Sequence, residues 1–209
     1  MLKNFVILYL FIFLNCTIKA QSFGGGGILG ISSSQVGGDN LSGFNKAGLL
    51  IGIFTNKSIS EFLKVQMEIT YIQKGSNNPN MNDFDNKNYL KEDISSSYIE
   101  APILLQYNHN EKIKLEGGGI IGFLIDGYYN DSNGKISNYN NINPFINYDF
   151  GLILGVTYKY SKKINLNTRI SNSILPIGTE DYQNQSTYNS YTKGKYNSVL
   201  SFSLYYNLQ

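Results

Sequence analysis

The chain is short of the residues from which most active sites and disulfide frameworks are built. Its 209 residues include one cysteine, one histidine and no tryptophan. The single histidine, His109, has neither a Gly-x-Ser-x-Gly elbow nor a second histidine to complete a catalytic or metal-binding motif. We therefore predict that the protein is not an enzyme and has no catalytic residue, cofactor or metal site, although chemistry carried by carboxylates alone stays open.

A long apolar run is also missing beyond the N-terminus. No later stretch reaches the roughly eighteen apolar residues that a membrane-spanning helix requires. The N-terminal run, Phe5 to Leu14, follows the basic Lys3 and has about the length of the apolar part of a signal peptide. Asn15 stands where a lipoprotein signal has a small residue, so cleavage after Ala20 is favoured over acylation of Cys16.

A signal peptide covering residues 1–20 changes the charge balance of the remaining chain. Its removal deletes Lys3 and Lys19 from the 17 Lys and Arg, so that the rest balance the 15 Asp and Glu. A formally neutral chain has no strong electrostatic attraction for nucleic acid, and we expect no such partner. The same cleavage removes the only cysteine, which excludes disulfides from the mature protein.

Glycine, tyrosine and a one-by-one alternation of apolar and polar residues are abundant. The sequence has 21 Gly and 17 Tyr, which is typical of a turn-rich β protein. A period of two, as in Asp149 to Tyr160, predicts strands with two different faces. Eight strands are predicted, at residues 23–35, 46–55, 62–75, 97–108, 112–127, 146–160, 163–176 and 197–208.

The connections between these strands alternate between long and short. Tight turns are expected near 56–58, 109–111 and 161–162, and long polar loops near 36–45 and at 76–96, 128–145 and 177–196. In an up-and-down barrel all the tight turns then lie at one end and all the long loops at the other, as in outer-membrane barrels. We predict an all-β fold, an eight-stranded antiparallel up-and-down transmembrane β-barrel, formed by residues 21–209.

The two faces of the predicted strands differ in charge. One face carries aliphatic residues such as Ile69 and Ile103, and the other carries most of the charged residues. Seven charged residues are predicted to form a network in the lumen: Lys64, Glu68, Glu100, Lys114, Glu116, Asp149 and Arg169. Eight strands leave room only for side chains, so a structural role is favoured over an ion path or gate. Asp126 is also predicted to face inward, and Glu100 with Arg169 is the expected central pair.

Several short motifs occur in an order that resembles the PorT-like outer-membrane β-barrel family of Bacteroidota. The strongest is Tyr98 to Tyr107, Tyr-Ile-Glu-Ala-Pro-Ile-Leu-Leu-Gln-Tyr, which is similar to the family's Tyr-Leu-Glu-Ile-Pro-Leu-Leu-Leu-Lys-Tyr. The other matches are Ser42 to Gly48 with Gly52, Glu68 to Ser76, Gly117 and Gly118 with Gly122, Asp149 to Gly151 with Gly155, and Ser198 to Asn207. Ala101 departs from the usual Ile or Val.

The resemblance implies an eight-stranded barrel in the cell outer membrane, whereas its implication for the biological role is weaker. The founding member is linked to a secretion system, and most relatives have no assigned role. We expect outer-membrane lipid as a partner, and protein partners through loops 76–96, 128–145 and 177–196. The favoured function is structural or interactive, supporting secretion or surface contacts. The alternatives are a small pore and a soluble periplasmic ligand-binding barrel, because alternation alone does not say which face is inside.

Overall fold

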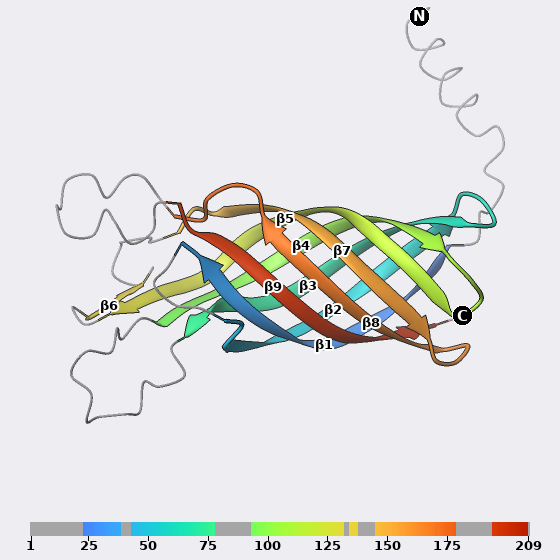
Figure 1. Cartoon of the computed structure of the whole chain (residues 1–209), viewed down its shortest axis with the longest axis horizontal. Helices are drawn as coiled ribbons and strands as arrows, with labels where there is room; N and C mark the ends of the chain where they lie inside the picture. Colours follow the sequence, from blue (N-terminus) through green and yellow to red (C-terminus); the bar gives the residue numbers. More distant parts are fainter. Residues whose placement is uncertain are drawn as a thin grey trace, which may run out of the picture.

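In the computed structural model, the described part of the chain forms nine strands (Figure 1). The structure describes residues 23–38, 43–77, 93–131, 134–137, 145–178 and 194–208. The strands are β1 (Gly24–Gly37), β2 (Lys46–Ser58), β3 (Leu63–Asn77), β4 (Asp93–Asn108), β5 (Ile113–Asp131), β6 (Gly134–Ser137), β7 (Tyr148–Lys159), β8 (Ile164–Ser173) and β9 (Tyr196–Asn207). The predicted signal peptide, residues 1–20, and most of the predicted long loops lie outside the described residues.

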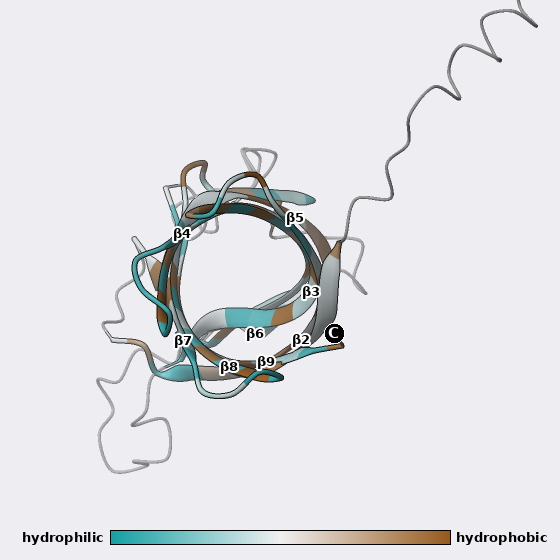
Figure 2. Cartoon of the chain, turned by 90° about the vertical axis from the view of Figure 1, so that its right-hand side faces the viewer, coloured by the Kyte–Doolittle hydropathy of each residue, from teal (hydrophilic) through white to brown (hydrophobic). Residues whose placement is uncertain are grey.

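Eight of these strands close into a barrel. Every pairing is antiparallel, in the order β4-β3-β2-β1-β9-β8-β7-β5, and a further pairing of β4 with β5 completes the ring. Figure 2 shows the ring seen along its axis. The predicted fold class is therefore confirmed. Over the described ranges, no helix is long and apolar enough to cross a membrane.

Three tight turns lie together at the end of the barrel that we call the short-turn end. Backbone bonds close them, from Ile59 to Leu63, from His109 to Ile113 and from Tyr160 to Ile164. The side chain of Asn110 accepts the amide of Ile113 at 2.7 Å, so its local hydrogen bonding specifies the turn. The predicted turns near 109–111 and 161–162 are confirmed. The first turn lies at residues 59–62 instead, because residues 56–58, predicted as a turn, belong to β2 and pair with β3. In outer-membrane barrels the short-turn end faces the periplasm, and the opposite end is called here the long-loop end.

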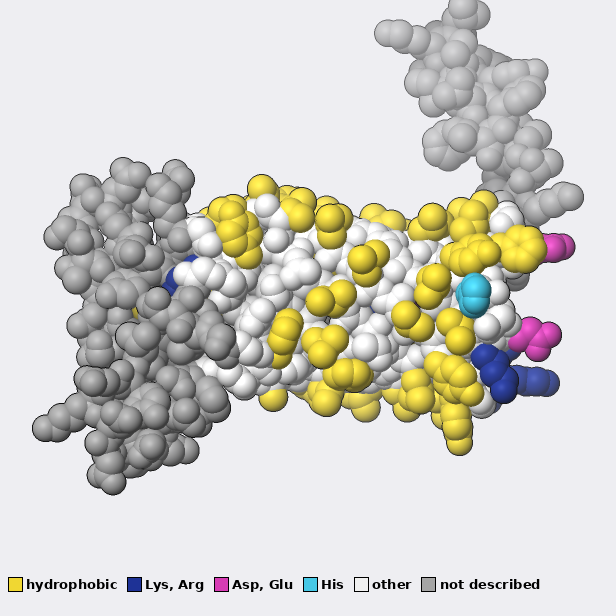
Figure 3. All heavy atoms as spheres, viewed as in Figure 1, with side chains coloured by type: hydrophobic (Ala, Val, Ile, Leu, Met, Phe, Trp, Pro, Cys, Tyr) yellow, Lys and Arg dark blue, Asp and Glu magenta, His cyan; other side chains and the backbone are white. Residues whose placement is uncertain are grey.

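The apolar face of the wall is turned outward. Met67 and Ile69 in β3 are 52% and 57% exposed, whereas Glu68 between them is 3% exposed. The same alternation gives Leu152 and Leu154 in β7 exposures of 59% and 66%. In Figure 3, apolar side chains, drawn in yellow, are distributed over the outer wall. A soluble monomer rarely exposes an apolar patch of more than a few hundred Å². An inverted, soluble ligand-binding barrel is therefore excluded, and this wall fits the interior of a bilayer.

The prediction differs from the structure at the long-loop end of β4 and β5. β4 begins at Asp93 rather than near 97, and β5 continues to Asp131. There β5 pairs with β6, so the segment 128–145 predicted as a loop begins as a hairpin. In Figure 1, β5 and β6 extend beyond the rim of the barrel at the long-loop end.

The prediction that Asp126 faces the lumen is wrong. The register shifts between Ser97, which pairs with Asp126, and Tyr98, which pairs with Leu124, so that Ile125 is an extra residue in β5. A bulge of this kind reverses the faces of every residue beyond it. Asp126 is consequently exposed on the outer face.

Candidate functional site

One arginine and two glutamates meet inside the barrel, in a group that we call the Arg169 cluster (Arg169, Glu68 and Glu116). Arg169 of β8 donates from both terminal nitrogens to Glu68 of β3, at 2.8 Å each. Its Nε donates to Glu116 of β5. The arginine is 5% exposed, and both glutamate side chains are 0% exposed. The cluster carries one positive and two negative charges when all three groups are ionised.

Neutral donors add further hydrogen bonds to the same two carboxylates. Gln66 and Tyr205 donate to Glu68 at 2.6 and 3.0 Å. Asn167 and Gln106 donate to the two oxygens of Glu116 at 2.7 and 2.9 Å. A buried carboxylate that accepts several hydrogen bonds can stay charged away from water. These hydrogen-bond donors therefore stabilise the excess negative charge of the cluster.

The Arg169 cluster joins opposite walls of the barrel. In the closed ring of eight strands, β8 and β3 are four places apart, which is the full diameter. The Arg169–Glu68 bridge consequently runs across the lumen rather than along one wall. The ring of Tyr205 packs beside it, with its centroid 5.2 Å from the guanidinium carbon. These side chains occupy the cross-section at this level.

A second ionic group lies nearer the long-loop end and is called the Lys74 cluster (Lys74, Glu100 and Asp149). Lys74 of β3 lies 2.5 Å from Glu100 of β4 and 3.0 Å from Asp149 of β7. Ser173 and Asn197 donate to the two oxygens of Asp149 at 2.6 and 2.9 Å. All three ionic side chains are at most 6% exposed. Like the Arg169 cluster, this one contains two carboxylates and one cation.

The structure brings five of the seven predicted lumen residues into these two clusters, and separates the other two. Lys64 and Lys114 lie at the short-turn mouth, where they line an open hollow. The expected pairing of Glu100 with Arg169 is wrong, because Glu100 contacts Lys74 instead. Lys74, which joins the second cluster, was not among the predicted site residues. Its position on the inward stripe of β3 was the available signal.

The uncharged inward residues were also missing from the predicted site. Gln66, Gln106, Asn167 and Asn197 are all buried and bonded to the ionic groups. They occupy the same stripes as the charged residues, so strand period alone would have found them. The lumen also contains an apolar layer beside the ionic groups. That layer consists of Ile28, Leu50, Phe54, Ile72, Tyr98, Val199 and Tyr205.

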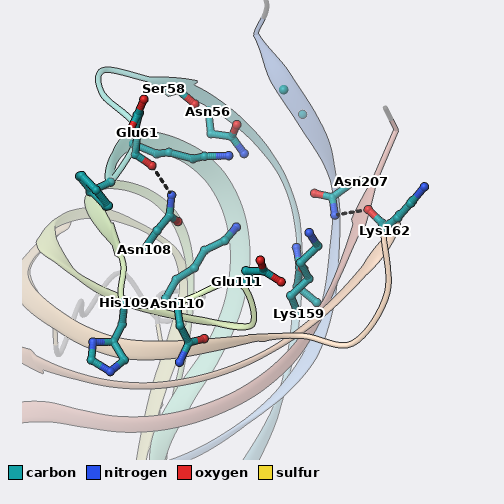
Figure 4. A pocket seen from close by; sticks show the side chains of 16 residues that line it. Asn56, Ser58, Glu61, Asn108, His109, Asn110, Glu111, Lys159, Lys162 and Asn207 are labelled. Atoms are coloured by element: carbon teal, nitrogen blue, oxygen red, sulfur yellow. Dashed lines mark hydrogen bonds between the residues drawn. The ribbon is translucent and has the colours of Figure 1, made fainter.

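Open space in the barrel is distributed unevenly. A cavity of about 10 Å³ lies beside Lys74, Glu100 and Asp149, which is close to the volume that one water molecule needs. A hollow of about 690 Å³ opens at the short-turn end (Figure 4). His109, on the rim of this hollow, is the only histidine of the sequence. Among the described residues, no three His, Cys, Asp or Glu side chains are grouped so as to hold a metal ion.

Several solved structures are similar to this chain. Ail, the attachment invasion locus protein of Yersinia pestis, is 12% identical with a TM-score of 0.52, over 88% of this chain and 98% of Ail. Ail in complex with the heparin analogue sucrose octasulfate is 9% identical with a TM-score of 0.50, over 90% and 99% of the two chains. Neisserial surface protein A is 11% identical with a TM-score of 0.47, over 88% and 96%. At these identities the likeness to Ail shows the fold alone.

Sequence comparison then identifies the family. No curated protein matches the chain. A family model described as outer membrane protein beta-barrel domain matches residues 19–179, which is well over half of the 209 residues. The predicted location in the outer membrane is thereby confirmed. The chain belongs to the outer membrane protein beta-barrel domain family.

Proposed function

We propose that this protein is a non-enzymatic outer-membrane barrel whose lumen is closed, and that it acts through contacts made by its long loops. The observation that carries the proposal is the ion pair between Arg169 and Glu68 across the full diameter of the ring. An eight-stranded barrel is just wide enough for side chains to fill. The charged network is then a structural device that joins the walls.

The Lys74 cluster supports a closed lumen at a second level. Lys74 links β3 to β4 and β7, and the space left beside it is about 10 Å³. A hydrated ion needs more room than one water molecule occupies. An ion crossing the barrel would have to displace both clusters in turn, at the cost of leaving buried charges unpaired.

The absence of enzymatic activity is supported by what surrounds the polar side chains. Each buried carboxylate of the two clusters is paired with Arg169 or Lys74, so none is left as a free base for a substrate. His109 lies on an exposed turn, and among the described residues no hydrogen bond joins its side chain to a serine or threonine that it could activate. The described residues thus offer no nucleophile paired with a base.

The role in the cell is proposed from the position of the loops and from relatives. Segments 76–96, 128–145 and 177–196 connect the strands at the long-loop end, which faces outward in outer-membrane barrels. The PorT-like resemblance favours partners that belong to a secretion apparatus. The complex of Ail with a heparin analogue favours a surface contact with a glycan or another cell. Both are interaction roles.

Conductance in planar bilayers tests the closed lumen. We expect the wild-type barrel to give no steady current, and the double variant Arg169→Ala with Lys74→Ala to conduct, because both levels lose the cation that binds the walls. A steady open channel in the wild type would contradict the proposal and favour the small pore.

Crosslinking in intact cells followed by purification tests the interaction role. The full chain is compared with a matched variant in which segments 78–92 and 179–193 are replaced by short Gly-Asn turns. We expect a defined partner with the full chain and its loss with the short-turn variant. A partner retained by the short-turn variant would place the contact elsewhere on the barrel.

A further inference from the structure

Positive charge is concentrated at the short-turn end, in a chain that is neutral after loss of residues 1–20. Two acidic residues, Glu61 and Glu111, lie on the turns there. The lysines of this end are Lys57, Lys64, Lys112, Lys114, Lys159, Lys162 and Lys163. Figure 3 shows basic side chains gathered at this end. The two carboxylates of the Arg169 cluster, which lies deeper in the barrel, are paired with Arg169 and form no ion pair with these lysines.

Part of this charge faces inward, into the hollow of about 690 Å³ that opens at the mouth. Lys64, Lys114 and Lys159 come from three different strands and all line it. Lys114 experiences the like charges of Lys64 and Lys159 as well as the opposite charge of Glu116. None of the three lysines has an ion-pair partner within 4.0 Å among the described residues. Figure 4 shows that Lys162, on the rim, points away from the hollow.

The inner wall of the hollow adds an uncharged polar group. Asn165 of β8 is 6% exposed and lines the hollow. Its side-chain amide has no hydrogen bond to the rest of the described chain. A polar group that faces an open hollow takes water or a ligand as its hydrogen-bond partner. Asn165 therefore offers a hydrogen bond at the same place where the three lysines offer charge.

We propose that the short-turn mouth is a binding site for a soluble anion that carries several phosphate groups. The volume of the hollow lies within the range of small-molecule sites, about 300–1,000 Å³. Ammonium groups on flexible stems bind phosphate as point charges without demanding one geometry. None of the lining residues belongs to the Arg169 cluster, and this cluster closes the lumen deeper in the barrel, so the anion enters and leaves from the periplasmic side. This site is independent of the loop contacts proposed above.

A soluble ligand is favoured over a lipid headgroup because of where the lysines point. The barrel wall separates the hollow from the bilayer, and Lys64, Lys114 and Lys159 lie on the inner side of that wall. Lys57, in contrast, stacks on the exposed ring of Phe23 at 5.9 Å and does not line the hollow. Glu61 and Glu111 on the rim weaken the attraction for an anion, but the three inward lysines outnumber these two glutamates.

Calorimetric titration of the folded chain in a maltoside detergent, with inorganic tripolyphosphate as the probe, tests the site. We expect saturable binding that is tighter than that of monophosphate and that weakens as salt is raised. The variant K64Q/K114Q/K159Q should lose at least about 10-fold in affinity. The control K57Q/K112Q/K163Q removes the same charge from the same end outside the hollow, and should change affinity by less than about 3-fold.

Several outcomes would overturn the proposal. These are absence of tripolyphosphate binding, an equal loss in the two triple variants, or tighter binding of a polyglutamate peptide than of tripolyphosphate. Nanodiscs distinguish a soluble phosphate from a lipid headgroup. If phosphatidylglycerol nanodiscs weaken tripolyphosphate binding and phosphatidylcholine nanodiscs do not, the lysines bind a lipid headgroup instead. Circular dichroism reports folding of each variant. If the triple variant does not fold, the three single variants should each show a part of the loss.

Discussion

Replacement of Arg169 by methionine is the sharpest test of how the lumen is held together. The change keeps an unbranched side chain of similar length but removes three charge-assisted hydrogen bonds, two to Glu68 and one to Glu116. It leaves two carboxylates, each 0% exposed, without their cation. Removal of one partner from a buried ion pair costs about 3–5 kcal/mol.

The surrounding amides place the expected cost at the lower end of that range. Glu68 keeps its bonds from Gln66 and Tyr205, and Glu116 keeps those from Asn167 and Gln106. We therefore expect Arg169→Met to lower the free energy of unfolding by about 3 kcal/mol. Arg169→Lys retains the charge but loses the planar fork, and should cost about 1–2 kcal/mol.

Urea unfolding of the barrel in lipid vesicles measures these changes. Tryptophan fluorescence is not available because the sequence has no tryptophan, so circular dichroism follows the strands. The decisive comparison adds E68Q and E116Q to Arg169→Met, which removes the unpaired charges and keeps the hydrogen-bonding shape. We expect this triple variant to regain most of the lost stability. A cost below about 1 kcal/mol for Arg169→Met, or a further loss in the triple variant, would refute the account of buried charge.

Three further predictions use the same unfolding measurement. Lys74→Met should lower the free energy of unfolding by about 3 kcal/mol. Its effect should add to that of Arg169→Met within about 0.5 kcal/mol, because the two clusters share no residue. Strong coupling between the two substitutions would show that the clusters form one network. Ile69→Lys, on the outer face at the middle of β3, should cost about 2–4 kcal/mol, whereas Ile59→Lys on a turn should cost little; equal costs would argue against a lipid-facing wall. Gly118→Ala should cost about 1–3 kcal/mol, since its new Cβ would lie 2.0 Å from the carbonyl oxygen of Ile103. Gly119→Ala, whose Cβ meets nothing closer than 3.9 Å, should be nearly neutral, and a similar cost at both positions would contradict the steric argument.

The wall of the barrel could be predicted from the sequence because its determinants are local. The alternation of Glu68 with Ile69 specifies a face through a period of two, with no knowledge of the neighbouring strand. Asn110 specifies a tight turn through bonds to amides two and three residues away. Eight strands and the short turns follow from such signals, whereas the choice of which face is outward also needed the order of long and short connections.

The contents of the lumen could not be predicted in the same way because its pairs are not local. Glu68 and Arg169 are separated by 101 residues, and whether they meet depends on the tilt and stagger of strands on opposite walls. A small error in stagger is enough to exchange the partners of Glu100, which explains the incorrect pairing with Arg169. The bulge that turns Asp126 outward adds one residue and leaves no clear mark in the composition of β5.

The inward and outward faces of this barrel are held by different forces, and that division bears on function. Lipid accepts the apolar side chains whatever the register, so the outer face alone does not choose between registers. The lumen does choose, because a buried carboxylate without its cation is costly, and the Arg169 cluster requires β3, β5 and β8 to be correctly staggered. Both ionic clusters are built wholly from strand residues. Sequence changes in the long loops therefore leave the scaffold intact, and one closed barrel can present different surface contacts without a change in its wall or its lumen.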